Sequence, residues 1–434
     1  MRRYISLILG LLLLTIASAT GITAQDADGT LTIQADEVIA EISPYVLGAN
    51  YGPLSAIPVD LIEAAQNSGI TFLRYPGGRW GDLNDIQPFQ IDMYIRIAKL
   101  IGAEPSIHVR LENGTPEAAA ELVRYTNIEK DYNIQYWYIG NEPNLFDDYT
   151  TEDLNVQWRA IAEAMLEVDP DITLIGPDVS QWNGTPEVNP QDPEGRDWLR
   201  EFLRANGDLV DVVSVHRYPF PRSMANPEVT IEDLRANLAE WDNIIPNLRQ
   251  VVLEETGREL PVAVTEANSH WSKAIGGEAT PDSHYNAIWW ADALGRMLRH
   301  EPFIVAYFDL QSSDGRGTWG LMATYNVRPT YYVYQFYQRF GQHMVEAQSD
   351  LEDVNVYAAQ REDGALTVIA INLGDEARTV SINIEGTSVN ALDERWLFDL
   401  EHPEATLIDA EDILNGEAAL LPPQSISMFV FGAE

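Results

Sequence analysis

The chain of 434 residues contains no cysteine. Disulfide bonds and thiolate-bound metal ions are therefore excluded, and packing alone must stabilise the fold. With 45% hydrophobic residues, a chain of this length can bury a core large enough for that purpose. The length also exceeds one average domain, and leaves room for a full (β/α)8 barrel and a small second domain.

Basic residues are scarce as well. Lysine and arginine together number 27 against 67 acidic residues, which gives a formal net charge of −40. The lysines are only Lys99, Lys130 and Lys273. A field of this sign repels nucleic acid and anionic membranes, so we expect neither as a partner. An acidic surface of this kind favours solubility or a neutral substrate.

Long apolar runs are missing except at the N-terminus. Residues 5–16 are almost entirely apolar, follow Arg2 and Arg3, and precede the small residues 17–19, Ala-Ser-Ala. This order is typical of a secretion signal, so residues 1–25 are predicted to be a signal peptide, with an uncleaved anchor as the alternative. No later stretch approaches about 18 apolar residues, so stable membrane insertion is not expected. We expect a secreted or otherwise extracytoplasmic protein, and the lack of cysteine favours a bacterial source.

Short apolar runs alternate with longer amphipathic ones from residue 45 onward. Strand character is found at 46–50, 71–75, 106–111, 135–141, 172–177, 210–217, 261–266 and 304–310. Helical periodicity is found at 60–68, 91–101, 116–126, 151–168, 195–206, 231–256, 283–299 and 327–340. Such an alternation predicts an α/β fold, a (β/α)8 TIM barrel over residues 43–341. A doubly wound open sheet is the competing architecture, but no glycine-rich dinucleotide loop follows the first strand.

The pattern changes after Gly341. Strand-like alternation separated by turn residues occurs at 354–360, 366–372, 379–385, 391–398 and 426–431. Residues 342–434 are therefore predicted to form an all-β sandwich domain. The early segment 30–42 also has strand character and is a candidate for one more strand of that domain.

Two glutamates follow strands of the predicted barrel. Glu142 comes directly after the apolar strand 135–141, and Pro143 then stops that strand. Glu266 ends the apolar run 261–266, the seventh strand. The fourth and seventh strands face each other across a barrel mouth, where the active sites of this fold lie. Glycosidic cleavage requires such a pair, one carboxyl group as proton donor and one as nucleophile. Capping a helix or pairing with an arginine is the alternative for either glutamate alone.

The motifs around these glutamates resemble the clan A glycoside hydrolases. Residues 141–143 read Asn-Glu-Pro after the fourth strand, with Glu266 after the seventh. Residues 73–78, Leu-Arg-Tyr-Pro-Gly-Gly, are similar to a turn in arabinofuranosidase- and xylosidase-like members. Residues 216–218, His-Arg-Tyr, are similar to the His/Tyr pair of the clan. A barrel followed by a β-sandwich is also the layout of families 39, 51 and 79, so the likeness spans nearly the whole chain after the signal.

The resemblance implies a role for each motif residue. Glu142 would be the general acid/base, with a raised pKa, and Glu266 the nucleophile, which must stay ionised. Arg74 would hold Glu266 in its charged form, with a structural ion pair elsewhere as the alternative. Asn141 would donate a hydrogen bond to the sugar 2-hydroxyl, and Tyr218 would donate its hydroxyl to Glu266.

Two further side chains are candidates for binding the sugar. His216 is expected to contact the sugar or to orient a carboxylate, with a satisfied core histidine as the alternative. Trp319, after the eighth strand, is the best candidate for an aromatic platform under a sugar ring, and the weaker ones are Trp80, Trp182 and Trp271. No second histidine or acid lies at metal-ligand spacing, so we expect no metal ion and no cofactor.

The substrate stays open at this level. The predicted activity is hydrolysis of O-glycosidic bonds in poly- or oligosaccharides, by double displacement through a covalent glycosyl-enzyme. A transglycosidase with the same intermediate and a catalytically idle carbohydrate-binding barrel are the alternatives. Arg79 and Arg110 are candidates for binding the carboxylate of a uronic acid. The sugar, its anomer, exo or endo action and the oligomeric state do not follow from these residues.

Overall fold

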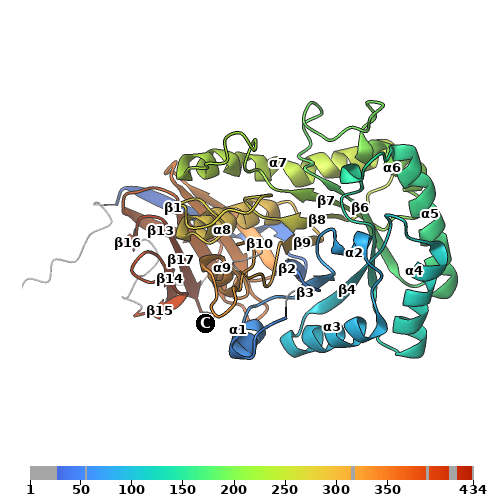
Figure 1. Ribbon diagram of the computed structural model, residues 1–434. Helices are drawn as coiled ribbons and strands as arrows, with labels where there is room; N and C mark the ends of the chain where they lie inside the picture. Colours follow the sequence, from blue (N-terminus) through green and yellow to red (C-terminus); the bar gives the residue numbers. More distant parts are fainter. Residues whose placement is uncertain (1–26, 54–55, 314–317, 388–390, 410–417, 433–434) are drawn as a thin grey trace, which may run out of the picture.

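The computed structural model describes residues 27–53, 56–313, 318–387, 391–409 and 418–432. It consists of a barrel and a β-sheet domain that lie side by side (Figure 1). The predicted signal peptide, residues 1–25, lies outside the described residues. Within the described part of the chain, no helix has both the length and the apolar composition needed to cross a membrane.

Eight parallel strands close into the barrel in chain order. They are β2 (Tyr45–Asn50), β3 (Phe72–Tyr75), β4 (Glu104–Val109), β5 (Tyr136–Ile139), β6 (Thr173–Ser180), β7 (Val212–Arg217), β8 (Val262–Ala267) and β9 (Ile304–Tyr307). Each of the eight predicted strands overlaps one of these, so the predicted barrel is confirmed. The strands read as continuous apolar runs because they are buried on both faces.

The barrel helices begin where the sequence supplies capping groups. α5 (Thr151–Val168) and α7 (Ile231–Thr256) have the predicted bounds, because Thr150 and Thr230 each accept a hydrogen bond from the third helical residue. The other helices are α1 (Ile62–Gln66), α2 (Trp80–Leu83), α3 (Pro88–Ile101), α4 (Pro116–Val123), α6 (Trp198–Asn206), α8 (His284–Leu298) and α9 (Pro329–Tyr337). Short 3-10 turns lie at Val59–Leu61 and Pro143–Leu145, and a π-helical segment at Arg124–Glu129. α2 is not among the predicted helices.

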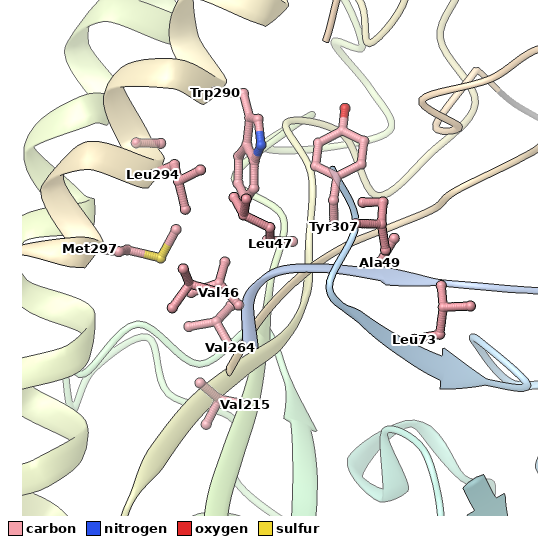
Figure 2. Packing of buried hydrophobic residues seen from close by; sticks show 14 of the residues in the cluster. Val46, Leu47, Ala49, Leu73, Val215, Val264, Trp290, Leu294, Met297 and Tyr307 are labelled. Atoms are coloured by element: carbon pink, nitrogen blue, oxygen red, sulfur yellow. The ribbon is translucent and has the colours of Figure 1, made fainter. Parts of the chain in front are cut away.

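The largest apolar cluster joins the barrel strands to the surrounding helices. In the part shown in Figure 2, Trp290 and Met297 of α8 point toward Val46 and Leu47 of β2. A second apolar cluster takes side chains from six of the barrel strands. Because it is separate from the cluster that contacts the helices, we place it inside the barrel. Its members are Phe72, Tyr138, Ile175, Val212, Ala263, Ile304 and Ala306. The barrel is thus packed on both sides of its wall, as the fold requires.

The second domain is one continuous mixed sheet of nine strands, in the order β15-β14-β17-β12-β11-β10-β1-β13-β16. The strands are β1 (Gly29–Glu41), β10 (His343–Ser349), β11 (Val354–Gln360), β12 (Leu366–Asn372), β13 (Arg378–Glu385), β14 (Leu392–Phe398), β15 (Thr406–Ile408), β16 (Ala418–Leu421) and β17 (Ser425–Phe431). β1 lies antiparallel to β10 and parallel to β13. β10, β15 and β16 are not among the predicted strands.

Both halves of this sheet contribute to one apolar core. Val380 and Leu421, on the last two strands of this order, lie in the same cluster as Val368 and Phe429, on its fourth and third strands. The sheet therefore curls around its core, and the predicted sandwich is one curled sheet instead of two separate ones. The fold class, a TIM barrel with a C-terminal β-domain, is confirmed.

Polar contacts fasten the sheet to the barrel helices. Asp292 of α8 accepts hydrogen bonds from the Tyr357 hydroxyl at 2.7 Å and from Asn355 Nδ2 at 2.8 Å, both on β11. Arg235 of α7 pairs with Asp375 at 2.8 Å, in the loop after β12. The β-domain therefore packs against α7 and α8 and adds none of the described residues that line the cleft at the barrel mouth.

Candidate active site

A sharp turn after β5 presents Glu142. Gly140 and Glu142 have φ angles of 81° and 50°, which turn the chain immediately after the strand. A positive φ is uncommon for a residue with a side chain, and the turn is held by a hydrogen bond from the Glu142 N–H to the Asp178 carbonyl at 3.1 Å. The side chain of Glu142 is 19% exposed and lies 3.2 Å from Nδ1 of His216. Its carboxyl group therefore reaches the barrel mouth with one side open to solvent.

Glu266 lies near the end of β8 and is almost fully buried. One carboxylate oxygen accepts hydrogen bonds from Arg74 Nη1 at 2.8 Å and from the Gly78 N–H at 3.0 Å. The other accepts one from the Tyr218 hydroxyl at 2.7 Å. Charge-assisted hydrogen bonds of this kind compensate the buried negative charge and fix the direction of the carboxylate. The contacts that the sequence predicts from Arg74 and Tyr218 to Glu266 are both present.

Arg74, at the end of β3, connects four strands beneath the mouth. Its guanidinium donates to Glu266 at 2.8 Å, to Asp178 at 2.8 Å, and to the side-chain oxygens of Asn50 and Asn141 at 2.9 Å each. Burial alone would lower the pKa of Arg74, but the negative charges of Asp178 and Glu266 outweigh burial and raise it. The site therefore contains a permanent buried cation beside the nucleophile candidate.

Asp178, on β6, is a site residue that sequence reasoning missed. Its carboxylate accepts hydrogen bonds from Ser214 Oγ and Thr265 Oγ1 and pairs with Arg74. Burial alone would raise the pKa of Asp178, but Arg74 and His216 outweigh burial and hold the pKa well below its ordinary range. Asp178 is thus a fixed anion that orients Arg74. Because it directly follows the predicted strand 172–177, the strand-end rule that selected Glu142 also applies to it.

His216, on β7, is fully buried between the acidic groups. Its Nδ1 lies 3.2 Å from Glu142 and 3.7 Å from Glu266, and its Nε2 lies 3.6 Å from Asp178. Burial alone would lower the pKa of His216, but Glu266, Asp178 and Glu142 outweigh burial and raise it to about 9. His216 is therefore protonated at neutral pH and bridges the two glutamates.

The predicted raised pKa of Glu142 is wrong for this arrangement. Burial alone would raise it, but the hydrogen bond and positive charge of His216, with smaller contributions from Ser180 and Arg74, outweigh burial and lower the pKa of Glu142. Glu142 and His216 therefore share one proton, and at neutral pH this proton resides on His216. Residue type alone could not reveal this, since the direction depends on the 3.2 Å contact.

The carboxyl groups of Glu142 and Glu266 lie close together at the mouth of the barrel. One oxygen of Glu142, one oxygen of Glu266 and one ring nitrogen of His216 all lie within 4.8 Å of one another. The spacing of Glu142, His216 and Glu266 in the sequence did not indicate this group, whose two carboxylates and one imidazole are common metal ligands. A metal ion fits poorly, because Arg74 already contacts Glu266 and because His216 is protonated at neutral pH. Carboxyl groups about 5–5.5 Å apart are those of retaining glycosidases, where the second carboxylate attacks the sugar directly.

Asn141 and Asp82 organise the acid side of the site. Asp82, in α2, accepts the backbone N–H groups of Asn141 at 2.8 Å and of Leu111 at 2.9 Å. The Asn141 side-chain oxygen accepts from Arg74, while its Nδ2 is buried and has no hydrogen-bond partner among the described residues. A buried donor without a partner is costly unless a ligand supplies the acceptor. Asp82 is a second positioning residue that the sequence argument missed.

A cleft of about 870 Å³ opens over the two glutamates, within the range of ligand sites. Tyr218 and Trp319 line it, as the sequence predicts for site residues. Trp319 is held in place by a hydrogen bond from Nε1 to the His270 carbonyl at 2.8 Å. Of the weaker tryptophan candidates, Trp271 lines the cleft, while Trp80 and Trp182 do not. The seven predicted site residues therefore lie together, four on the cleft wall and Arg74, Asn141 and His216 beneath it.

Comparison with known proteins gives relatives in sequence and in fold. No family model matches the chain. Over 232 residues it is 26% identical to an intracellular exo-α-(1→5)-L-arabinofuranosidase of Streptomyces lividans, which covers 44% of this chain and 33% of the relative. The chain thus spans about a third of the length of that curated relative.

Solved structures match over nearly the whole chain. A family 51 α-L-arabinofuranosidase from Bifidobacterium longum has a TM-score of 0.74 at 16% identity, and covers 93% of this chain and 99% of its own. A family 44 xyloglucanase from Paenibacillus polymyxa has a TM-score of 0.71 at 14% identity, with 93% and 99% covered. At these identities the structures establish a shared fold. The resemblance found in the sequence motifs is confirmed: the chain is similar to the family 51 arabinofuranosidases of clan A in sequence, and shares their fold of barrel and β-domain.

Proposed function

We propose that this protein is a retaining glycoside hydrolase of the arabinofuranosidase type, which cleaves O-glycosidic bonds of poly- or oligosaccharides. One observation carries the proposal: oxygens of Glu142 and Glu266 lie within 4.8 Å of each other at the mouth of the barrel. An idle sugar-binding barrel has no need of two glutamates so close together, since the repulsion between them must be offset by Arg74 and His216.

In the first step, Glu266 attacks the anomeric carbon while the bond from that carbon to the leaving oxygen breaks. Arg74, Gly78 and Tyr218 hold the carboxylate in a fixed direction, so that little reorganisation is needed during the attack. Glu142 gives its proton to the leaving oxygen, which departs as an alcohol. The products of this step are a glycosyl ester on Glu266 and a Glu142 carboxylate.

Glu142 receives its proton from His216. A sugar covering Glu142 removes water from its open side, and this desolvation raises the pKa of Glu142 relative to that of its neighbour. The proton on Nδ1 of His216 is 3.2 Å away and can then move to the carboxylate. The Glu142–His216 pair thus supplies an acid at neutral pH, although Glu142 alone is held ionised.

In the second step, Glu142 accepts a proton from water, and the resulting hydroxyl attacks the anomeric carbon. The ester bond to Glu266 breaks, and the sugar leaves with its original configuration. The unpaired Nδ2 of Asn141 is the donor we assign to the sugar 2-hydroxyl. Trp319 and Trp271 provide aromatic faces along the cleft for the rings.

Hydrolysis of aryl glycosides tests the proposal directly. The panel consists of α-L-arabinofuranosides, xylosides, glucosides, galactosides and glucuronides, each with the same nitrophenyl leaving group. We expect turnover of the arabinofuranoside, and proton NMR should show that the first-formed sugar keeps the anomeric configuration of the substrate. Inversion would refute the double displacement, and no turnover of any member would refute the hydrolase. Methanol added as acceptor separates a hydrolase from a transglycosidase by the share of methyl glycoside formed.

Export is the second part of the proposal, and it rests on the N-terminal sequence alone. The basic start, the apolar run 5–16 and the small residues 17–19 support a cleaved signal. Expression of the full chain in a bacterium, followed by fractionation and N-terminal sequencing, is the test. We expect a mature protein outside the cytoplasm that begins between residues 20 and 26, and an intact N-terminus on cytoplasmic protein would refute export.

A further inference from the structure

The charged side chains along the cleft are unlike those of the chain as a whole. Acidic residues outnumber basic ones by 67 to 27 in the sequence. Among the described residues that line the cleft, however, the only acids are Glu142 and Glu266, while three arginines, Arg79, Arg217 and Arg222, line it as well. Apart from the reacting pair, the charged side chains on the described wall of the cleft are therefore all arginines, on a protein with an excess of acidic residues.

Arg217 is not available to a ligand. Its Nε and Nη2 bind the carboxylate of Glu240 in a two-pronged ion pair, and its Nη1 donates to Gln181 at 3.0 Å. The ion pair neutralises the charge and fixes the guanidinium. Arg217 therefore shapes the cleft wall without offering a free donor.

Arg79 and Arg222 have N–H groups that remain available to a ligand. Arg79 is 45% exposed and reaches Glu112 through Nη2 alone, at 3.3–3.4 Å, so Nε and Nη1 have no partner among the described residues. Arg222 is exposed, lies 5.6 Å from the ring of Phe220 and contributes to the lowered pKa of Asp233, but it forms no ion pair within the described part of the chain. The free Nε and Nη1 of Arg79 and the guanidinium of Arg222 can still donate hydrogen bonds to a carboxylate, although Arg79 Nη2 is paired with Glu112.

Arg110, the other arginine that the sequence offers for a sugar acid, lies elsewhere. It lines a separate cavity of about 460 Å³ beside α4, together with Asn84 and Tyr125. Its Nε donates to the Glu112 carbonyl at 2.7 Å and its Nη1 to Asp85 at 3.2 Å. The structure therefore separates the two candidates, with Arg79 in the cleft and Arg110 outside it.

We propose that the cleft binds a saccharide with a carboxylate-bearing sugar, a uronosyl residue, next to the sugar that is cleaved, and that Arg79 and Arg222 recognise this carboxylate. The inference rests on the proposed hydrolase and names its substrate class. The long-range field of the protein opposes an anionic substrate, and the two arginines offer it a local attraction. The net charge of the chain suggested a neutral substrate, whereas the arginines of the cleft favour an acidic one.

The test compares one oligosaccharide in two forms. Both contain an α-L-arabinofuranosyl group beside a uronosyl residue, and in the second form the uronosyl carboxylate is reduced to a primary alcohol. We measure kcat/KM at low and high salt for the wild type, for Arg79→Ala and Arg222→Ala alone and combined, and for Arg110→Ala as the matched control. Each cleft variant should lose about fivefold on the acidic form, the loss expected of one exposed charge pair, and nothing on the reduced form. Added salt should weaken the preference for the acidic form in the wild type, and Arg110→Ala should behave like the wild type.

Three outcomes overturn the inference while leaving the hydrolase standing: equal kcat/KM for both forms, equal loss on both forms in the double variant, or the same loss in Arg110→Ala. Failure of the hydrolase itself has a different signature, since neither form nor any aryl glycoside would then be cleaved. In that case binding of the acidic oligosaccharide, measured by calorimetry with wild type and double variant, still decides the inference. Equal affinities of the two proteins would refute it.

Discussion

Replacement of His216 by glutamine is expected to remove a pH-dependent part of the protein's stability. The histidine is fully buried, and the surrounding carboxylates raise its pKa from 6.5 to about 9. At 1.36 kcal/mol per pKa unit, this shift corresponds to about 3 kcal/mol. Because the folded-state pKa is raised, the contribution is fully present below pH 6.5 and is lost as the pH rises through about 9.

The assay is urea unfolding of wild type and His216→Gln at several pH values between 6 and 10. The free energy of unfolding of the wild type should fall by about 3 kcal/mol more than that of the variant over this range. His300→Gln is the control, because burial lowers the pKa of His300 and its charge then contributes nothing above pH 6.5. Parallel pH profiles for wild type and His216→Gln would refute the reasoning.

The remaining predictions concern single side chains. Tyr218→Phe removes one hydrogen bond to Glu266, and kcat/KM for an aryl glycoside should fall about tenfold or more with little change in melting temperature; an unchanged kcat/KM would contradict this role. Asp178→Asn leaves the buried Arg74 with one carboxylate fewer, and urea unfolding should show a loss of about 3 kcal/mol. Thr230→Ala removes the cap of α7 and should cost about 1 kcal/mol in the same assay without any change in kcat.

Periodicity was sufficient to predict the barrel and most of the sheet. Barrel strands such as Val262–Ala267 are buried on both faces and read as apolar runs, and the long helix Ile231–Thr256 begins at a capping threonine. The missed elements are short or mixed. Thr406–Ile408 and Ala418–Leu421 have only three and four residues, too few to show an alternation, and His343–Ser349 mixes polar and apolar side chains.

Site residues could be predicted from the sequence when a polar residue ends a strand. Contacts between residues on distant strands could not be predicted in this way. Glu142, Glu266 and Arg74 follow that rule. The rule also applies to Asp178, but no motif drew attention to it. The direction of the Glu142 pKa could not be predicted, because it depends on how closely folding brings His216 to the carboxyl group.

The proposed double displacement depends most on Glu266 as the nucleophile. The decisive measurement is the activity of Glu266→Ala on an activated aryl glycoside, with and without sodium azide. Without azide, turnover should be lost, because no carboxylate can form the glycosyl ester. With azide, turnover should return, and the product should be a glycosyl azide of inverted configuration, since azide then attacks from the side that Glu266 occupied. Wild-type activity of Glu266→Ala in the absence of azide would contradict the double displacement.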